Sequence, residues 1–269
     1  MKPSYLCAMN EALHTRLLPY VALRLDDEVS GVRLLVGDVS PMVADARLRA
    51  EAMEGVSPFR RAKAVALTPP RSQALSLGAA LLLDALLSER GLRERDMNYV
   101  EGEHGKPELQ VGASPNGEPR HAVLFNLSHS GALAAAALLA NCQPQERPEP
   151  QKILLGVDIQ RVTRYRPELV RRVFSHADLA RLSACPDEVS RERLFARLWS
   201  RAEAYAKATG DGLRWPFPEP PAEARFHDFA VDAAEVLTAS QGDDGRHRAE
   251  YYGSLCLLPV NSSFIIHNS

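Results

Sequence analysis

Apolar residues recur at helical spacing in two long stretches of the chain. The first runs from Arg71 to about Arg90, where leucines 75, 82 and 86 share one face and Gly91 follows as a C-terminal cap. The second runs from about Glu192 to Thr209 and is rich in alanine, with its bulky apolar residues on one side. Both patterns predict amphipathic helices. Shorter helical stretches are expected at 59–63, which is basic, and from 167 onward.

Runs of β-branched and apolar residues predict the strands. A strand or a hairpin is expected over 20–25 and 32–36, where two aspartates and Gly31 interrupt the apolar pattern. The run 131–140 is too short to cross a bilayer, which needs about 20 residues, and is interpreted as a buried strand or a small-residue helix. Further strands are predicted at 123–127, 153–159, 229–231, 251–260 and 264–266.

Helices and strands are therefore mixed along the whole chain, which predicts an α+β fold. The segment 141–150 is polar and contains three prolines, so we expect an exposed connection between an N-terminal half, 1–146, and a C-terminal half, 147–269. The segments 99–119 and 215–221 are rich in glycine or proline and are interpreted as loops.

Composition narrows the class of protein. Of the 269 residues, 45% are hydrophobic and 25% are charged, as in ordinary globular proteins, and the net charge of -2 gives no general reason to expect nucleic acid or an acidic membrane as partner. The N-terminus lacks the apolar segment of a signal peptide. The four cysteines are far apart, without the spacing of a zinc site. We therefore expect a soluble cytoplasmic protein.

The segment Gly156 to Gln160 follows an apolar run and ends a predicted strand. Residues two apart in a strand point to the same face, so Asp158 and Gln160 should project together. An acid at this place would hold a hard divalent cation. The alternative is an acid that caps the following turn.

The second predicted helix carries Trp199, Glu203 and Lys207 four residues apart, on one face. The alternative is a surface Glu–Lys pair beside a buried tryptophan. Gly210 and Gly212 should end this helix.

Two further segments have side chains suited to phosphate. The short polar side chains and the histidine of Asn126 to Gly131 could donate to phosphate oxygens, and Lys106 lies in a rigid Gly-Lys-Pro turn. A turn with a hydrogen-bonded histidine and an ordinary surface turn are the respective alternatives.

In order, Gly105-Lys106-Pro107, Asn126-Leu127-Ser128-His129-Ser130, Gly156-Val157-Asp158-Ile159-Gln160 and Trp199 to Lys207 resemble the successive signatures of 4′-phosphopantetheinyl transferases of the surfactin-synthetase type. The phenylalanine and serine of Val173-Phe174-Ser175 match a further family feature. The resemblance runs from about residue 59 to 212.

The resemblance implies a pseudodimer of two similar halves with the active site in the cleft between them. It also implies transfer of 4′-phosphopantetheine from coenzyme A to a serine of an acyl, polyketide or peptidyl carrier protein, with release of 3′,5′-ADP. An internal pseudodimer favours a monomer. Mg²⁺ is the expected cofactor, bound by Asp158, Glu203 and Gln160, with Glu203 as the catalytic base.

The remaining roles that the resemblance implies concern coenzyme A. Lys207 would contact the pyrophosphate, Ser128 and His129 would meet phosphates, and the Gly105-Lys106-Pro107 turn would border the adenine. The residues similar to the family's clamp on the 3′-phosphate are Arg60, Lys63 and Arg71, with Arg61 in the same basic stretch.

Two departures from the family pattern leave another function open. Gln160 stands where the family has glutamate, and Ala202 stands where it has lysine. A degenerate relative that binds coenzyme A or a carrier protein without transfer is therefore the alternative. An unrelated metal-dependent phosphohydrolase would explain the acidic residues but not the ordered set of motifs.

Overall fold

The computed structural model describes residues 21–27, 31–101, 106–113, 119–139, 152–232 and 250–260, and all structural statements below concern these residues. The elements before residue 140 are β1 (Val21–Asp27), β2 (Val32–Asp38), α2 (Ser40–Ala44), α3 (Ala46–Gly55), α4 (Pro58–Val65), α5 (Pro70–Ser88), the 3₁₀ helix η1 (Glu94–Asp96), β3 (Asn98–Glu101), β4 (Pro107–Ala113), β5 (Pro119–Val123), β6 (Phe125–Ser130) and β7 (Leu133–Leu139). Those after residue 151 are β8 (Lys152–Arg161), α6 (Pro167–Val173), α7 (His176–Ser183), α8 (Glu188–Thr209), β9 (Arg225–Asp232) and β10 (Glu250–Val260).

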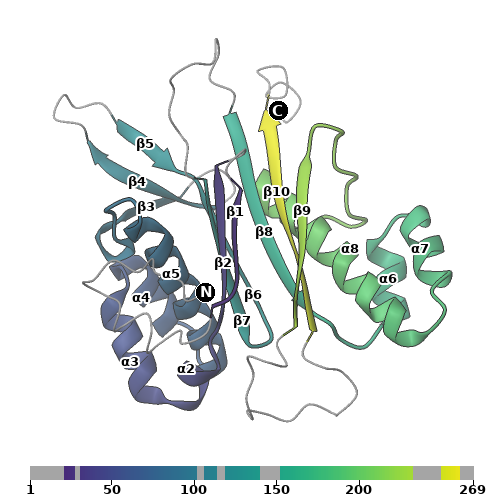
Figure 1. The fold of residues 1–269 in the computed structure, drawn as a ribbon, viewed down its shortest axis with the longest axis horizontal. Coiled ribbons are helices and arrows are strands. Elements are labelled where there is room, and N and C mark those ends of the chain that lie inside the picture. The colour runs from purple at the N-terminus through teal and green to yellow at the C-terminus, as the bar shows by residue number, and fades with distance from the viewer. Residues whose placement is uncertain are drawn as a thin grey trace.

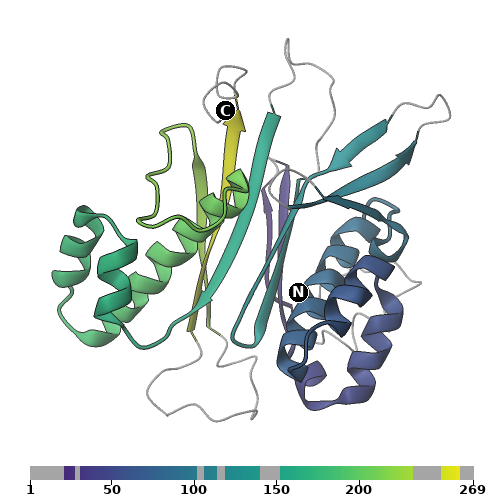
Figure 2. The same ribbon diagram turned by 180° about the vertical axis from the view of Figure 1, so that it is seen from behind.

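The strands form three antiparallel sheets, with the orders β1-β2-β7-β6, β8-β10-β9 and β3-β4-β5. Helices α2 to α5 lie on one side of the two larger sheets, and α6 to α8 lie on the other (Figure 1). The reverse view shows the same order of layers (Figure 2). The mixed α+β class that the sequence predicts is confirmed.

The alternation of side chains along the strands explains the layers. In β2, Val32, Leu34 and Val36 point to an apolar layer shared with β8 and β10, whereas Leu35 points to α5. The same alternation holds in β7, where four consecutive alanines, 134–137, supply small side chains to both faces. The two larger sheets thus pack face to face.

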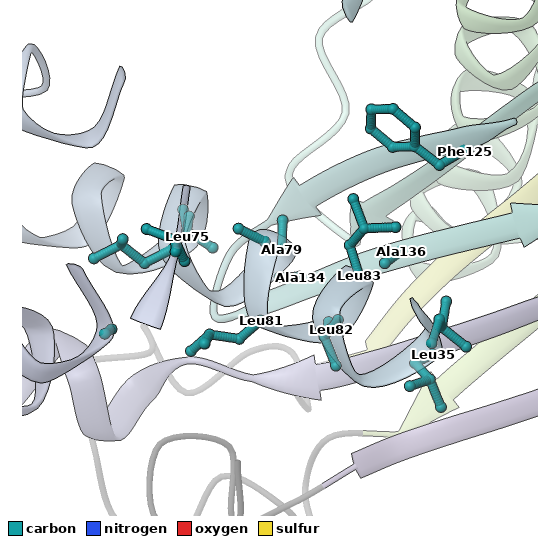
Figure 3. Close-up of a cluster of buried hydrophobic side chains, with 14 of the residues drawn as sticks. Leu35, Leu75, Ala79, Leu81, Leu82, Leu83, Phe125, Ala134 and Ala136 are labelled. Atoms are coloured by element: carbon teal, nitrogen blue, oxygen red, sulfur yellow. The ribbon is translucent and has the colours of Figure 1, made fainter. Parts of the chain in front are cut away.

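Helix α5 buries its leucines and alanines against the outer face of the first sheet (Figure 3). Gly91 has φ 70°, which confirms the predicted glycine stop after α5. No helix within the described parts of the chain is long and apolar enough to span a membrane.

Most predicted elements are present with shifted ends. The hairpin, the helix expected at 71–90, the helix expected at 192–209 and the strands at 153–159 and 251–260 correspond to β1–β2, α5, α8, β8 and β10. The run 131–140 forms a strand, β7, and not a helix. The segments 141–150 and 264–266, and the proposed boundary at residue 146, lie outside the described residues.

Two groups of elements differ from expectation. The segment 99–119, interpreted as a loop, contains most of the small β3-β4-β5 sheet, and helix α3 was not expected. In α3 the apolar residues are few, and Asp45 caps the helix by accepting from the Arg47 backbone N–H at 2.7 Å. The cap and the packing against α5, rather than an apolar stripe, define this helix.

Candidate active site

A pocket of about 430 Å³ lies where α4, α5 and β6 face β8 and α8. It brings together eight of the residues predicted for the site from four different elements: Arg60, Lys63, Ser128, His129, Asp158, Gln160, Glu203 and Lys207. Acidic and basic side chains share this pocket, which is the arrangement expected around a metal ion and phosphates.

Asp158 reaches the pocket because of its place in β8. Its neighbours Val157 and Ile159 point to the layer between the sheets, so Asp158 points toward α8 and is 3% exposed. Its Oδ1 accepts from Ser128 Oγ at 2.7 Å and from Lys207 Nζ at 2.6 Å. Its Oδ2 is buried and, while Glu203 is ionised, has no hydrogen-bond partner among the described residues.

Helix α8 supplies Glu203 and Lys207 from successive turns. Its N-cap is Asp187, which accepts from the Ser190 backbone N–H at 2.7 Å, and it ends at Gly210 with φ 80°. Lys207 Nζ lies 3.8 Å from Glu203 Oε2 and is closer to Asp158. The predicted shared face of the helix is confirmed by this pair.

A glycine in β8 lets α8 come close to the strand. A Cβ atom on Gly156 would lie 2.0 Å from the Ala204 carbonyl oxygen and 2.5 Å from the Ala208 backbone nitrogen. Any larger residue would push α8 outward. Gly156 therefore sets how near Glu203 and Lys207 approach Asp158.

The pKa of Glu203 is raised to about 7, first by burial and then by the negative charge of Asp158. Lys207 and a hydrogen bond from Trp199 act in the opposite direction. The positive charge of Lys207 therefore does not offset the effects of burial and of Asp158 on Glu203.

The opposite wall of the pocket is basic. Burial and the neighbouring Arg60 lower the pKa of Lys63. The side chain of His129 is partly accessible to solvent, but the pocket walls reduce the hydration of its imidazole. This loss of hydration, and then the positive charge of Lys207, lower the pKa of His129. Like charges gathered this way favour an anionic ligand.

Arg60 is held more firmly than the other basic residues. It is 5% exposed, its guanidinium lies 4.8 Å from the centroid of the Tyr99 ring, and its Nε donates to the Tyr99 hydroxyl at 3.2 Å. Its Nη2 is buried without a partner. Arg71 is not among the residues that line the pocket, and its Nε donates to the Gly131 carbonyl at 3.1 Å.

Lys106 also lies apart from the pocket. Its Nζ donates to the backbone carbonyls of Lys207 at 2.8 Å, Leu155 at 3.0 Å and Ala208 at 3.3 Å. The ammonium thus binds carbonyl oxygens at the C-terminal end of α8, where the helix carries negative partial charge. Pro107 begins β4, and Gly105 lies outside the described residues.

The donor set fits a hard divalent cation. The described residues contain no group of three His, Cys, Asp or Glu side chains that could hold a metal ion. Magnesium needs only one or two carboxylates when phosphates and water complete its shell. Asp158 and Glu203 would supply them if such an ion binds here, and the buried Oδ2 of Asp158 is the atom that a cation would satisfy. Gln160 lines the same pocket, while its Nε2 donates to the Arg161 carbonyl at 2.9 Å.

The sequence predicted phosphate contacts for the short polar side chains of the segment 126–131, but Asn126 and Ser130 are not among the residues that line the pocket. The segment 126–130 was expected to follow a strand, but it belongs to strand β6 itself. Its polar residues at 126, 128 and 130 alternate with Leu127 and His129. This period of two was the signal for a strand.

Comparison with known proteins agrees with the motifs. Residues 154–256 match the sequence model of the 4′-phosphopantetheinyl transferase superfamily. The chain is 30% identical over 147 residues to the 4′-phosphopantetheinyl transferase HetI of Nostoc sp., covering 54% of this chain and 55% of that protein. It is 29% identical over 140 residues to the 4′-phosphopantetheinyl transferase Sfp of Bacillus subtilis, covering 52% of this chain and 53% of that protein.

These alignments span about half the length of the curated relatives. The region matched by the family model includes Asp158, Glu203 and Lys207. The resemblance carried by the motifs is confirmed: over this region, the chain is similar to the 4′-phosphopantetheinyl transferase superfamily and to transferases such as HetI and Sfp.

Proposed function

We propose that the protein transfers 4′-phosphopantetheine from coenzyme A to a serine of an apo acyl, polyketide or peptidyl carrier protein, in a Mg²⁺-dependent reaction that releases 3′,5′-ADP. The supporting observation is the pocket in which the partnerless Oδ2 of Asp158 lies beside Glu203 and Lys207. The similarity to the superfamily suggests the class of reaction, and this pocket provides side chains suited to it.

Asp158 and Glu203 would hold the metal ion, with the Gln160 side chain at the third position. When bound, Mg²⁺ would neutralise charge on the pyrophosphate and on the leaving 3′,5′-ADP. Glu203 would need this cation to ionise fully near neutral pH, because its pKa is raised to about 7 without metal.

The basic side chains would bind coenzyme A. Lys207 would contact the pyrophosphate and His129 a phosphate oxygen, while Arg60 and Lys63 would face the 3′-phosphate, since all four line the pocket. We keep Arg71 as a predicted contact of coenzyme A, and Ser128 as one that does not use its hydroxyl proton, because that proton is donated to Asp158. For Gly105, Lys106 and Pro107 the proposed contact with adenine is through the backbone, because the Lys106 ammonium is bound to carbonyls.

The chemical step would be an in-line displacement. The carrier serine oxygen forms a bond to the β-phosphorus, which carries the pantetheine, and the bond from that phosphorus to the bridging pyrophosphate oxygen breaks. Glu203 accepts the serine proton, directly or through a water. Lys207 and His129 offset the negative charge that develops on the phosphate oxygens.

We also propose the pseudodimer of the halves 1–146 and 147–269, acting as a cytoplasmic monomer with its active site between them. Each of the larger sheets carries a long helix on its outer face, α5 on one and α8 on the other, and the pocket is lined from both sides (Figures 1 and 2).

A mass measurement tests the proposed function. We expect the protein, with coenzyme A and Mg²⁺, to add one phosphopantetheinyl group to an apo carrier protein, and a chelator to stop the reaction. Asp158→Asn keeps the size of the side chain but removes its charge, and should leave the carrier mass unchanged. Full transfer in excess chelator would exclude the metal from the mechanism.

A protein that binds without transfer is the second candidate. It is supported by Ala202, which packs against the apolar cluster of α6, α7 and Trp199 where the family has a lysine. Unchanged carrier mass across several carriers, with calorimetric binding of coenzyme A, would favour this second function over the first.

A further inference from the structure

A row of three polar side chains on β6 is hydrogen-bonded to the backbone of β8. Asn126 Oδ1 accepts from the Val157 N–H at 2.9 Å, and Ser128 Oγ accepts from the Ile159 N–H at 3.2 Å. Ser130 Oγ accepts from the Arg161 N–H at 3.0 Å. The contacts advance by two residues on both strands, so we call these three side chains the polar row.

The polar row satisfies an otherwise open strand edge. Among the described strands, β8 is the outer strand of its sheet, with β10 on one side. Backbone N–H groups alternate between the two edges of a strand, so those of residues 157, 159 and 161 face away from β10. Because Val157 and Ile159 are buried, their two N–H groups need partners within the protein.

The row also fixes how the two larger sheets lie against each other. Asn126 and Ser128 stand opposite Ala137 and Ala135 of β7, on the face that packs against β8. A shift of β8 by one residue would turn Asp158 away from the pocket and into the apolar layer. Three acceptors at intervals of two residues oppose such a shift.

The middle member of the row connects this edge to the candidate active site. The single Ser128 hydroxyl proton is donated to Asp158 Oδ1, and the oxygen accepts from Ile159 N–H and from Lys207 Nζ at 2.9 Å. These contacts use the full capacity of a hydroxyl group. Asn126 and Ser130 are absent from the residues that line the pocket.

We infer that Asn126 and Ser130 are positioning residues, which hold the edge of β8 on β6 and thereby place Asp158 in the site. Ser128 acts in the same row by orienting Asp158 and Lys207. The effect on transfer rests on the proposed function, whereas the hydrogen bonds between the strands do not depend on it.

Amide hydrogen exchange and transfer kinetics test this inference together. In Ser130→Ala we expect the Arg161 amide to exchange at least tenfold faster, while the exchange rate of the Val157 amide is unchanged. In Asn126→Ala we expect the Val157 amide to exchange at least tenfold faster, while the rate of the Arg161 amide is unchanged. In the double variant, kcat at saturating coenzyme A, carrier and Mg²⁺ should fall at least tenfold at a temperature well below unfolding. Ser130→Thr retains the hydroxyl, so the exchange rate of the Arg161 amide and kcat should both equal those of the wild type.

Leu138→Val is the matched control. Leu138 lies in β7 opposite Phe125 and is buried in the core beside α5, so this change loosens the same sheet without touching the polar row. It should lower the melting temperature and leave kcat unchanged.

Three results would overturn the inference. They are unchanged exchange at residues 157 and 161, a double variant with the kcat of the wild type, and an equal loss of kcat in Leu138→Val. If the wild type transfers nothing to any carrier, the proposed function fails, while exchange still decides whether the row holds the strand edge.

Discussion

The two oxygens of the Asp158 carboxylate have different surroundings. Oδ1 is bound by Ser128 and Lys207, whereas Oδ2 is buried without a partner. A buried charged group with an unsatisfied oxygen is costly, and a second carboxylate nearby adds repulsion. Burial first, and then the charge of Asp158, raise the pKa of Glu203. A cation in the pocket would relieve both costs.

Glu203→Gln should therefore separate activity from stability. Transfer should fall by a factor of about 100 or more, as expected for loss of a general base and metal ligand. Without divalent metal, the raised pKa gives the wild type stability that is fully present below pH 4.5 and lost as the pH rises through about 7. Glu203→Gln has no carboxyl to ionise and does not lose this stability. Between pH 4.5 and about 7, its melting temperature should therefore rise relative to that of the wild type.

Melting curves across this pH range, with chelator present, provide the measurement. A parallel series with Mg²⁺ should show a smaller difference, because the cation stabilises the ionised carboxylate. A constant difference between the two proteins at every pH would mean that Glu203 titrates normally.

Gln160→Glu should lower the magnesium concentration needed for half-maximal transfer. At an effective dielectric constant near 20, a pair of unit charges about 4 Å apart is worth about 4 kcal/mol. Repulsion from Asp158 and Glu203, and loss of the hydrogen bond to the Arg161 carbonyl, oppose this gain. If about 1.4 kcal/mol survives, the half-maximal concentration falls roughly tenfold.

A magnesium titration of both forms decides this prediction. Turnover at saturating metal should change little, because metal occupancy would no longer limit it. Overlapping titration curves would show that residue 160 does not face the metal.

Spacing in the sequence predicted the shared directions of Asp158 with Gln160 and of Glu203 with Lys207, because strand and helix periods are local properties. It did not predict that Lys106 binds carbonyls 49 to 102 residues away along the chain. Such partners depend on tertiary packing, which spacing does not encode.

At the scale of elements, long periodic segments were predictable and short ones were not. Helix α5 and strands β8 and β10 carry enough apolar residues to define their period. The strands of the β3-β4-β5 sheet are short and rich in polar residues. Pairing with each other, rather than local preference, makes them strands.

Lys106→Met should destabilise the end of α8. The change removes a charged donor from three backbone carbonyls, two of them in the last turn of the helix. We expect a loss of about 2 kcal/mol in the free energy of unfolding, as is typical of hydrogen bonds that involve a charged group. Urea denaturation measures it.

Kinetics with Lys106→Met distinguish this role from binding of coenzyme A by the ammonium. A helix-end role lowers stability, whereas an ammonium that binds phosphate would raise KM for coenzyme A without a loss of stability. Lys63→Met is the matched control, because Lys63 also lines the pocket but lies on α4 and not at the end of α8. It should raise KM and leave the free energy of unfolding nearly unchanged.

At the scale of the molecule, one apolar layer joins elements from distant parts of the chain. Leu34 of β2 and Ala135 of β7 are buried together with Val157 of β8 and Leu255 of β10. Separating the two larger sheets would expose this whole layer to water, which is unfavourable in proportion to its area. The polar row on β6 adds hydrogen bonds at the rim of the same interface.

Unfolding should therefore be a single cooperative transition that involves both larger sheets. The two tryptophans, Trp199 and Trp215, both lie after residue 151, so fluorescence reports that part of the chain alone. Far-ultraviolet circular dichroism also reports α2 to α5, which lie before residue 140. Because the shared layer couples the sheets, the urea midpoints from the two probes should coincide. A fluorescence midpoint clearly apart from the dichroism midpoint would show that the sheets unfold separately, and that the apolar layer holds them together only weakly.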